Sequence, residues 1–224
     1  MTTKAPIAVI ITTFNSEKYL DEAINSALSQ TSRPAELIVV DNGSADATQS
    51  ISERYGIPFF VQMVGLVGES RNLGLENTKS LFIKFLDADD VLAKSALADL
   101  LAGQQASKAD LIYGQNINFL NQLDENQEAK NFAHTEKPIH SATVLNSLIP
   151  RETFHKYGLP DQDNHSWNRW IVNSKIAGLH MHKIQDVVGY RRIHDSNISH
   201  AEVSKRELFE LIASNLKGRK SKDA

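Results

Sequence analysis

The stretch Leu81-Phe82-Ile83-Lys84-Phe85-Leu86-Asp87-Ala88-Asp89-Asp90 joins an apolar run of strand length to three carboxylates within four residues. A continuous apolar run is typical of a parallel strand that is covered on both faces, and such a strand delivers its last residues to an open sheet edge. Asp87 and Asp89 lie two residues apart, so an ideal strand would project both carboxylates to one side. Such a pair can bind Mg²⁺ or Mn²⁺ and leave coordination positions for phosphate oxygens. The alternative is a surface turn with a helix N-cap, where Asp is also favoured.

The composition limits the classes of protein to consider. The chain has 224 residues, a net charge of −3 and no cysteine. This length is enough for one sizeable α/β domain, or for one domain with a small appendage. The absence of cysteine excludes disulfides and thiolate sites, and the net charge gives no support to a nucleic-acid partner. The first residues enter a strand pattern without a signal-peptide layout, and no apolar segment approaches the roughly 18 residues that span a bilayer. We therefore expect a cytoplasmic protein, with peripheral contact to the inner face of a membrane left open.

Strand and helix patterns alternate along the chain. Apolar runs predict strands over residues 7–11, 36–40, 58–64, 81–86, 109–119 and 182–188. Helical spacing predicts helices over residues 19–28, 93–101, 166–177 and 201–216, with shorter ones after residue 48, from residue 69 and between residues 150 and 158. Residues 121–138 are polar and predict a long loop. This alternation predicts a doubly wound, mostly parallel α/β sheet with helices on both faces, whose ligand lies beyond the carboxyl ends of the strands. Asp41 and Asp87 both occupy such ends.

Five segments carry a resemblance to a known family. They are Val9-Ile10-Ile11-Thr12-Thr13-Phe14-Asn15, Ile38-Val39-Val40-Asp41-Asn42-Gly43-Ser44, Gly68-Glu69-Ser70-Arg71-Asn72-Leu73-Gly74, Phe85-Leu86-Asp87-Ala88-Asp89-Asp90, and Tyr190-Arg191 with His194. In this order and spacing the chain resembles the family 2 glycosyltransferases of the GT-A fold. The resemblance implies an inverting transferase that uses a nucleoside-diphosphate sugar. It divides a single domain, 1–224, into a nucleotide-sugar half (1–115), an acceptor half (116–200), and a C-terminal helix with a basic tail (201–224).

The resemblance also assigns roles to residues. It places Thr12, Thr13, Phe14, Asn15, Asp41, Gly68, Arg71, Asp87 and Ala88 around the nucleotide, and Asp87, Asp89 and His194 around Mn²⁺ or Mg²⁺. The Asp41 carboxylate would face the imide N–H of uracil, guanine and thymine being the other bases to consider, and its alternative role is to cap a turn. Arg71 would contact the diphosphate, because a planar guanidinium suits phosphate geometry. Trp167 and Trp170 would line the acceptor site or belong to the core.

The general base is where the sequence departs from the family. An inverting transferase needs a group that takes the proton of the acceptor hydroxyl. Family members usually carry an acidic pair just before the Trp-rich helix, and His165-Ser166 stands there in this chain. Three explanations stay open: Asp163 or Asp161 supplies the base from a shortened loop, His165 acts directly, or the chain binds nucleotide-sugar with weak or no catalysis.

Other classes and partners follow from the same residues. A nucleotidyltransferase of related fold would start with a Gly-rich, basic phosphate loop, and residues 12–16 contain neither Gly nor Lys. An oxidoreductase is disfavoured because no G-x-G-x-x-G follows the first strand. The expected partners are the sugar donor and a saccharide or lipid-linked acceptor. The basic stretch 217–222 is a solvated tail or a contact to anionic lipid. Neither the donor sugar, the linkage nor the oligomeric state is predicted.

Overall fold

A computed structural model describes residues 5–63, 66–119, 138–163 and 166–194. The chain divides into two compact units, Met1–Arg192 and Ile193–Ala224. The architecture below is that of the first unit, because only Ile193 and His194 of the second are described. The predicted loop 121–138 lies almost entirely outside the described residues, and the predicted helix 201–216 and basic tail lie wholly outside them. The division into donor and acceptor halves stays a prediction.

Nine strands and six helices make up the described part of the chain. The strands are β1 Ala5–Thr13, β2 Pro34–Asp41, β3 Phe59–Val61, β4 Phe82–Asp87, β5 Val91–Leu92, β6 Leu111–Phe119, β7 Ile139–His140, β8 Ser147–Pro150 and β9 Met181–Arg192. The helices are α1 Leu20–Leu28, α2 Thr48–Arg54, α3 Val67–Glu76, α4 Ala96–Ser107, α5 Arg151–Tyr157 and α6 Ser166–Ile176. None of these helices is both long enough and apolar enough to cross a bilayer.

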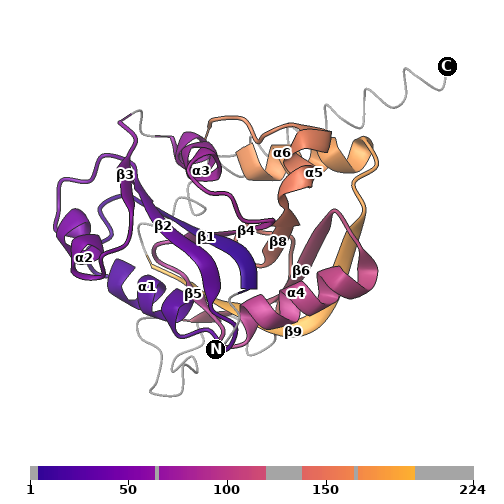
Figure 1. Cartoon of the computed structure of the whole chain (residues 1–224), viewed down its shortest axis with the longest axis horizontal. Coiled ribbons are helices and arrows are strands. Elements are labelled where there is room, and N and C mark those ends of the chain that lie inside the picture. Colours follow the sequence, from indigo (N-terminus) through magenta and orange to yellow (C-terminus); the bar gives the residue numbers. More distant parts are fainter. Residues whose placement is uncertain (1–4, 64–65, 120–137, 164–165, 195–224) are drawn as a thin grey trace. The chain divides into compact units, whose positions relative to one another are not determined.

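The strands form one sheet in the order β3-β2-β1-β4-β8-β6-β9-β5, with β7 beside β6. The first four are parallel, as strand–helix–strand crossovers require, whereas β8 runs antiparallel to both β4 and β6. Figure 1 shows α1, α2 and α4 on one face of the sheet and α3, α5 and α6 on the other. The predicted α/β fold with helices on both faces is therefore confirmed.

Burial on both faces explains why the central strands are mostly apolar. In β1, Ile7, Val9 and Ile11 pack into the core beneath α1 and α4. The alternate residues, Ala8 and Ile10, pack into the core beneath α3, α5 and α6. Successive strand side chains point to opposite faces, so a strand covered on both sides can carry few polar residues before it ends.

The pairing register then decides which polar residues meet at the open edge. Thr13 is paired with Asp41 across β1 and β2, and Thr12 is paired with Asp87 across β1 and β4. Thus the parallel strands bring together polar residues that are up to 75 positions apart in the sequence. The carboxyl edge of β2, β1 and β4 is therefore the candidate position of the functional site.

Several predicted boundaries differ from the structure. Among the described residues of the strand predicted over 58–64, only those of β3 form a strand. The helix predicted over 93–101 is α4, which begins at Ala96 after a turn closed by the Ala96 N–H and the Ala93 carbonyl. The helix predicted from residue 69 begins two residues earlier, so Gly68 is the second residue of α3. The short strands β5, β7 and β8 had no clear signal, since each is completed by partners distant in sequence.

Candidate active site

Asp87 is the centre of the strand-end site, and two groups already bind it. The Thr12 hydroxyl donates to its Oδ1 at 3.0 Å, and Nη2 of Arg71 donates to the same oxygen at 2.8 Å. Oδ2 accepts no hydrogen bond from the described residues, and the side chain is 38% exposed. One oxygen is thus fixed by two hydrogen bonds, while the side chain keeps more than a third of its surface exposed.

Arg71 reaches Asp87 from α3 and is almost fully buried. Its Nε has no hydrogen-bond partner among the described residues, and neither has the buried hydroxyl of Thr13. Buried polar groups of native proteins are nearly always paired, so a water molecule or a ligand would complete the hydrogen bonding of these two atoms. An anion with several acceptor oxygens would satisfy the Arg71 donors.

The acidic turn after β4 is held by the backbone. The Ala88 N–H donates to the Thr12 carbonyl at 3.0 Å, and the Asp90 N–H donates to the Asp87 carbonyl at 3.0 Å. Asp89 is half-buried, whereas Asp90 is buried and accepts a bond from the Arg192 N–H at 3.1 Å. Burial, together with the charges of Asp89 and Asp87, raises the pKa of Asp90 well above its usual range.

The donor set of this turn suits a hard cation only in part. No three His, Asp or Glu side chains within the described residues are arranged to bind one metal ion. Asp87 with its second oxygen and the half-buried Asp89 nevertheless match the one or two carboxylates by which Mg²⁺ is commonly held alongside substrate phosphates. The residues therefore fit an ion that is shared with substrate phosphates better than an ion that is bound by the protein alone.

The loop after β1 and the turn after β2 are joined by reciprocal hydrogen bonds. The Asn15 N–H donates to the Ser44 hydroxyl at 2.8 Å, and the Asn15 side-chain carbonyl accepts from the Ala45 N–H at 2.9 Å. Asn15 has a φ of 47°, a left-handed conformation that Asn tolerates better than most residues. Phe14, beside it, is 57% exposed. The loop thus presents an aromatic ring at the strand ends from a fixed backbone.

Asp41 caps the turn that follows β2. Its Oδ2 accepts the N–H groups of Gly43 and Ser44 at 3.2 and 2.8 Å, and its Oδ1 accepts the Ser44 hydroxyl at 2.5 Å. The carboxylate is 4% exposed. This is the capping role that the sequence offered as the alternative; contact with a nucleobase stays a prediction.

Gly68 makes a contact that the sequence did not reveal. A Cβ at this position would lie 2.4 Å from the Asp161 carbonyl oxygen and 2.5 Å from the Gln162 carbonyl group. The neighbouring Glu69 N–H donates to the Gln162 carbonyl at 3.1 Å, and the Asn72 amide donates to the Pro160 carbonyl at 3.1 Å. The N-terminal half of α3 therefore packs directly against the loop that carries Asp161 and Asp163.

Arg169 of α6 binds both candidate carboxylates in that loop. Its Nε lies 2.9 Å from Asp161 Oδ2, and its Nη2 is ion-paired with Asp163. His165, the other candidate base, lies outside the described residues. The structure thus shows a clamped acidic loop before α6, while the identity of the base stays a prediction.

Trp167 and Trp170 belong to the core. Each is 5% exposed, and their indole N–H groups donate to the carbonyls of Ala142 and Gly158, both at 2.8 Å. The Trp167 ring also meets the Phe85 ring edge to face at 6.2 Å between centroids. Contact with an acceptor, through the little surface they keep, stays a prediction. His194 lies in the second unit, so its predicted role beside the metal also stays a prediction.

Sequence reasoning missed Lys84, which is fully buried in β4. Its ammonium donates to the Val144 carbonyl at 3.2 Å and to the Leu145 carbonyl. Burial lowers the pKa of Lys84 to about 7, although the charges of Asp90 and Asp87 oppose this shift. The sequence signal that could have identified Lys84 is that it is the one charged residue within the apolar run 81–86.

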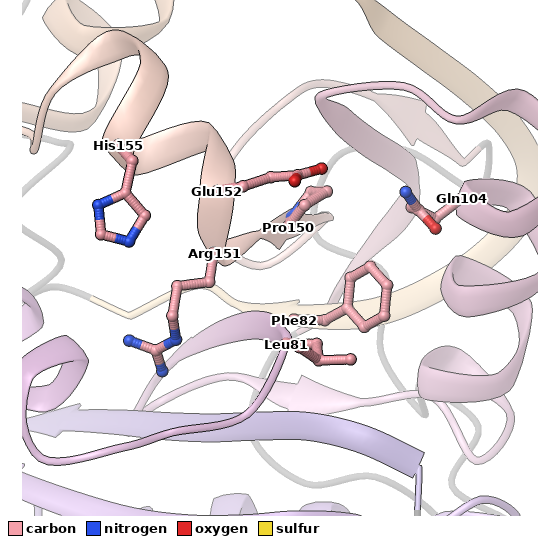
Figure 2. A pocket seen from close by; sticks show the side chains of 7 residues that line it. All are labelled: Leu81, Phe82, Gln104, Pro150, Arg151, Glu152 and His155. Carbon is pink, nitrogen blue, oxygen red and sulfur yellow. The ribbon is translucent and has the colours of Figure 1, made fainter.

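A pocket of about 330 Å³ lies at the other end of β4. Figure 2 shows Leu81 and Phe82 on one side of it and Arg151, Glu152 and His155 of α5 on another. The Arg151 guanidinium is already bonded to the carbonyls of Ser80 and Leu75 and to the Thr78 hydroxyl. The residues that line this pocket include none of the predicted site residues.

The fold and the residues at the strand ends define the class of protein: an α/β protein of the GT-A fold, with acidic residues at the carboxyl ends of parallel strands. The chain belongs to glycosyl transferase family 2, whose family model matches residues 8–174.

The relatives agree with this assignment. The chain is 26% identical over 226 residues to an uncharacterized glycosyltransferase of Rickettsia typhi, covering 92% of this chain and 70% of that protein. It is 36% identical over 117 residues to the poly(ribitol-phosphate) beta-N-acetylglucosaminyltransferase TarP of Staphylococcus aureus, covering 49% of this chain and 36% of TarP. The solved structure of S. aureus TarS 1-349 in complex with UDP-GlcNAc matches with a TM-score of 0.70 at 21% identity, covering 93% of this chain.

The lengths differ among these proteins. The chain spans 64% of that TarS chain and 60% of a second TarS 1-349 structure. The likeness to TarS shows the fold.

Proposed function

We propose that the chain is an inverting glycosyltransferase that moves a sugar from a nucleoside-diphosphate sugar to a hydroxyl group of a saccharide or lipid-linked acceptor. The observation that carries the proposal is the convergence of Thr12, Arg71 and Asp87 at the carboxyl edge of the parallel strands. A UDP-sugar is the first donor to test, because the similar TarS fragment has been solved with UDP-GlcNAc.

The donor would lie across the strand ends. The exposed Phe14 ring and the turn capped by Asp41 would flank the base, and the buried Arg71 guanidinium would face the diphosphate. Asp87 and Asp89 would hold Mn²⁺ or Mg²⁺, which stabilises the negative charge of a departing nucleoside diphosphate when it is bound. Arg71 balances the charge of Asp87 and therefore also fixes the orientation of this carboxylate.

The acceptor hydroxyl would lose its proton to a group in the loop before α6. Asp163 is the first candidate and His165 the second, since either can accept a proton near neutral pH. The ion pair with Arg169 holds the Asp163 side chain in place within this loop. The contact between α3 and residues 160–162 would hold this loop beside the helix that carries Arg71.

Asp161 and Asp163 form a matched pair for testing the base. Both are bound by Arg169 and lie two residues apart in the same loop. If Asp163 is the base, Asp163→Asn lowers the transfer rate by about 10² to 10⁴-fold, while Asp161→Asn retains most of it. Wild-type rates in both variants would exclude both carboxylates and favour His165, whereas a loss confined to Asp161→Asn would identify Asp161 as the base.

Nucleotide-sugar binding without turnover is the second candidate function. It is favoured by the departure before α6, where His165-Ser166 stands in place of the acidic pair that is usual in the family. A donor that binds tightly but is neither hydrolysed nor transferred would support this function.

The deciding experiment is a binding and turnover screen of UDP-, GDP- and dTDP-sugars, with and without Mn²⁺. We expect one donor to bind in a Mn²⁺-dependent manner and to be slowly hydrolysed. Asp89→Ala should lose both properties, whereas Asp186→Ala, which removes an exposed carboxylate of β9, should lose neither. Absence of binding by every donor would contradict the proposal.

A further inference from the structure

Arg192, the last residue of β9, is a buried arginine attached to the acidic turn. Only 3% of the residue is exposed. Its Nε donates to the Asp89 carbonyl at 3.1 Å, and its backbone N–H donates to Asp90 Oδ1 at 3.1 Å. One residue thus binds two consecutive members of the turn, and neither bond uses the Asp89 carboxylate.

The rest of the Arg192 guanidinium is held from outside the turn. Its Nη2 is ion-paired with Glu22 of α1. Its Cζ lies 4.9 Å from the centre of the Tyr19 ring and 4.5 Å from that of the Phe119 ring. An ion pair and two aromatic faces offset the cost of burying this cation and leave it little freedom to move.

The connection continues through the strand that follows the turn. Val91 and Leu92 of β5 pair with Tyr190 and Gly189 of β9. The acidic turn is therefore anchored to β1 at its start, through Ala88, and to β9 at its end, through Arg192 and β5. The direction in which Asp89 leaves the backbone depends on both anchors.

We propose that Arg192 is a positioning residue, which orients Asp89 toward the donor diphosphate and its metal ion. This inference rests on the proposed function. Arginine is required because its planar fork can bind the Asp89 carbonyl and the Glu22 carboxylate at the same time. A lysine supplies one ammonium on a flexible stem and cannot keep both contacts in the same geometry.

Arg192→Lys tests this role, because it keeps the positive charge and removes the fork. We expect the affinity for Mn²⁺ in the presence of UDP, measured by titration calorimetry, to fall roughly tenfold or more, as is typical when a residue that orients a metal ligand is changed. The change cannot come from net charge, which the substitution preserves.

Arg151→Lys is the matched control. Arg151 is also a partly buried arginine that donates to backbone carbonyls, but it lies beyond the opposite end of β4. A purely structural role for Arg192 predicts that both variants lose thermal stability and that both keep the wild-type Mn²⁺ affinity in the presence of UDP. That result would overturn the inference.

Glu22→Ala covers the case in which Arg192→Lys fails to fold. It keeps Arg192 and releases the outer end of the guanidinium, so the affinity for Mn²⁺ with UDP should fall by about threefold or more. Unchanged affinity would again overturn the positioning role. If the wild type binds UDP and Mn²⁺ and the variants bind them equally well, the positioning role fails and the proposed function stands. If the wild type binds neither, the positioning role and the proposed function are both overturned.

Discussion

Gly68→Ala tests the contact between α3 and the loop before α6 directly. The new Cβ would lie 2.4 Å from the Asp161 carbonyl oxygen and 2.5 Å from the carbonyl carbon and oxygen of Gln162. These are backbone atoms, which cannot rotate away as a side chain can. The helix and the loop must therefore separate, and the hydrogen bond from the Glu69 N–H to the Gln162 carbonyl must lengthen or break.

The cost follows from three contributions. Overpacking a well-packed site costs about 1–3 kcal/mol, and losing the Glu69 bond costs about 1 kcal/mol. Replacing Gly by Ala inside a helix returns up to about 1 kcal/mol. We expect a net loss of about 1–3 kcal/mol in the free energy of unfolding. For a chain of this size, each kcal/mol lowers Tm by about 2–4 °C.

The assay is urea denaturation, together with the rate of sugar transfer and the affinity for UDP. Because the loop carries Asp163, the rate should fall more than the UDP affinity. Gly103→Ala is the control: the same change inside α4 brings its Cβ to 2.7 Å from the Ile184 Cγ2, a side-chain atom that can shift. A Gly68→Ala protein as stable as the wild type would refute this packing.

Three further predictions concern β4, α3 and the turn after β2. Lys84 has a pKa of about 7 when folded and an ordinary pKa of 10.5, so the unfolded chain binds more protons between these values and the free energy of unfolding rises with pH there. Between pH 7 and 9.5 this rise is at most about 3 kcal/mol. Urea denaturation of Lys84→Met should show an unfolding free energy without this rise. If the wild type and the variant depend on pH in the same way, the lowered pKa of Lys84 is contradicted. Arg71→Gln should weaken UDP binding about tenfold or more by equilibrium dialysis, since it removes a charge-assisted contact, and wild-type affinity would place the diphosphate elsewhere. Asp41→Asn should lower the free energy of unfolding by about 1 kcal/mol, because the amide replaces one of the two carboxylate oxygens that accept hydrogen bonds from Ser44. If the affinity of this variant for UDP is unchanged, Asp41 has only the capping role.

The sequence predicts those parts of the fold that depend on local pattern. Residues 7–11 are apolar throughout because both faces of β1 are buried, and this property is visible without coordinates. Asp41 and Asp87 end apolar runs, so their place at one sheet edge follows from parallel pairing. Thr12 lies beside Asp87 because of the register in which β1 pairs with β4. The alternation of strands and helices in the sequence predicts that such strands are parallel.

The contacts that complete the site could not be predicted in the same way. Gly68 looks like a loop glycine until the loop at Asp161, more than 90 positions away, is seen against it. Arg192 is one of two adjacent arginines near the end of a strand, and its partners lie on α1, on β6 and in the turn after β4. Trp167 and Trp170 resemble site residues in sequence, but their N–H groups are used by backbone carbonyls of the core. Each of these outcomes depends on tertiary packing between distant segments.

The most direct test of the account is a crystal structure of the protein with UDP and Mn²⁺, with the ion located by its anomalous scattering. We expect one Mn²⁺ at about 2.1 Å from carboxylate oxygens of Asp87 and Asp89, with the diphosphate beside Arg71. A manganese ion away from these two carboxylates, or UDP bound elsewhere, such as in the pocket beside Arg151, would contradict the central claim that the carboxyl ends of β1, β2 and β4 form the donor site.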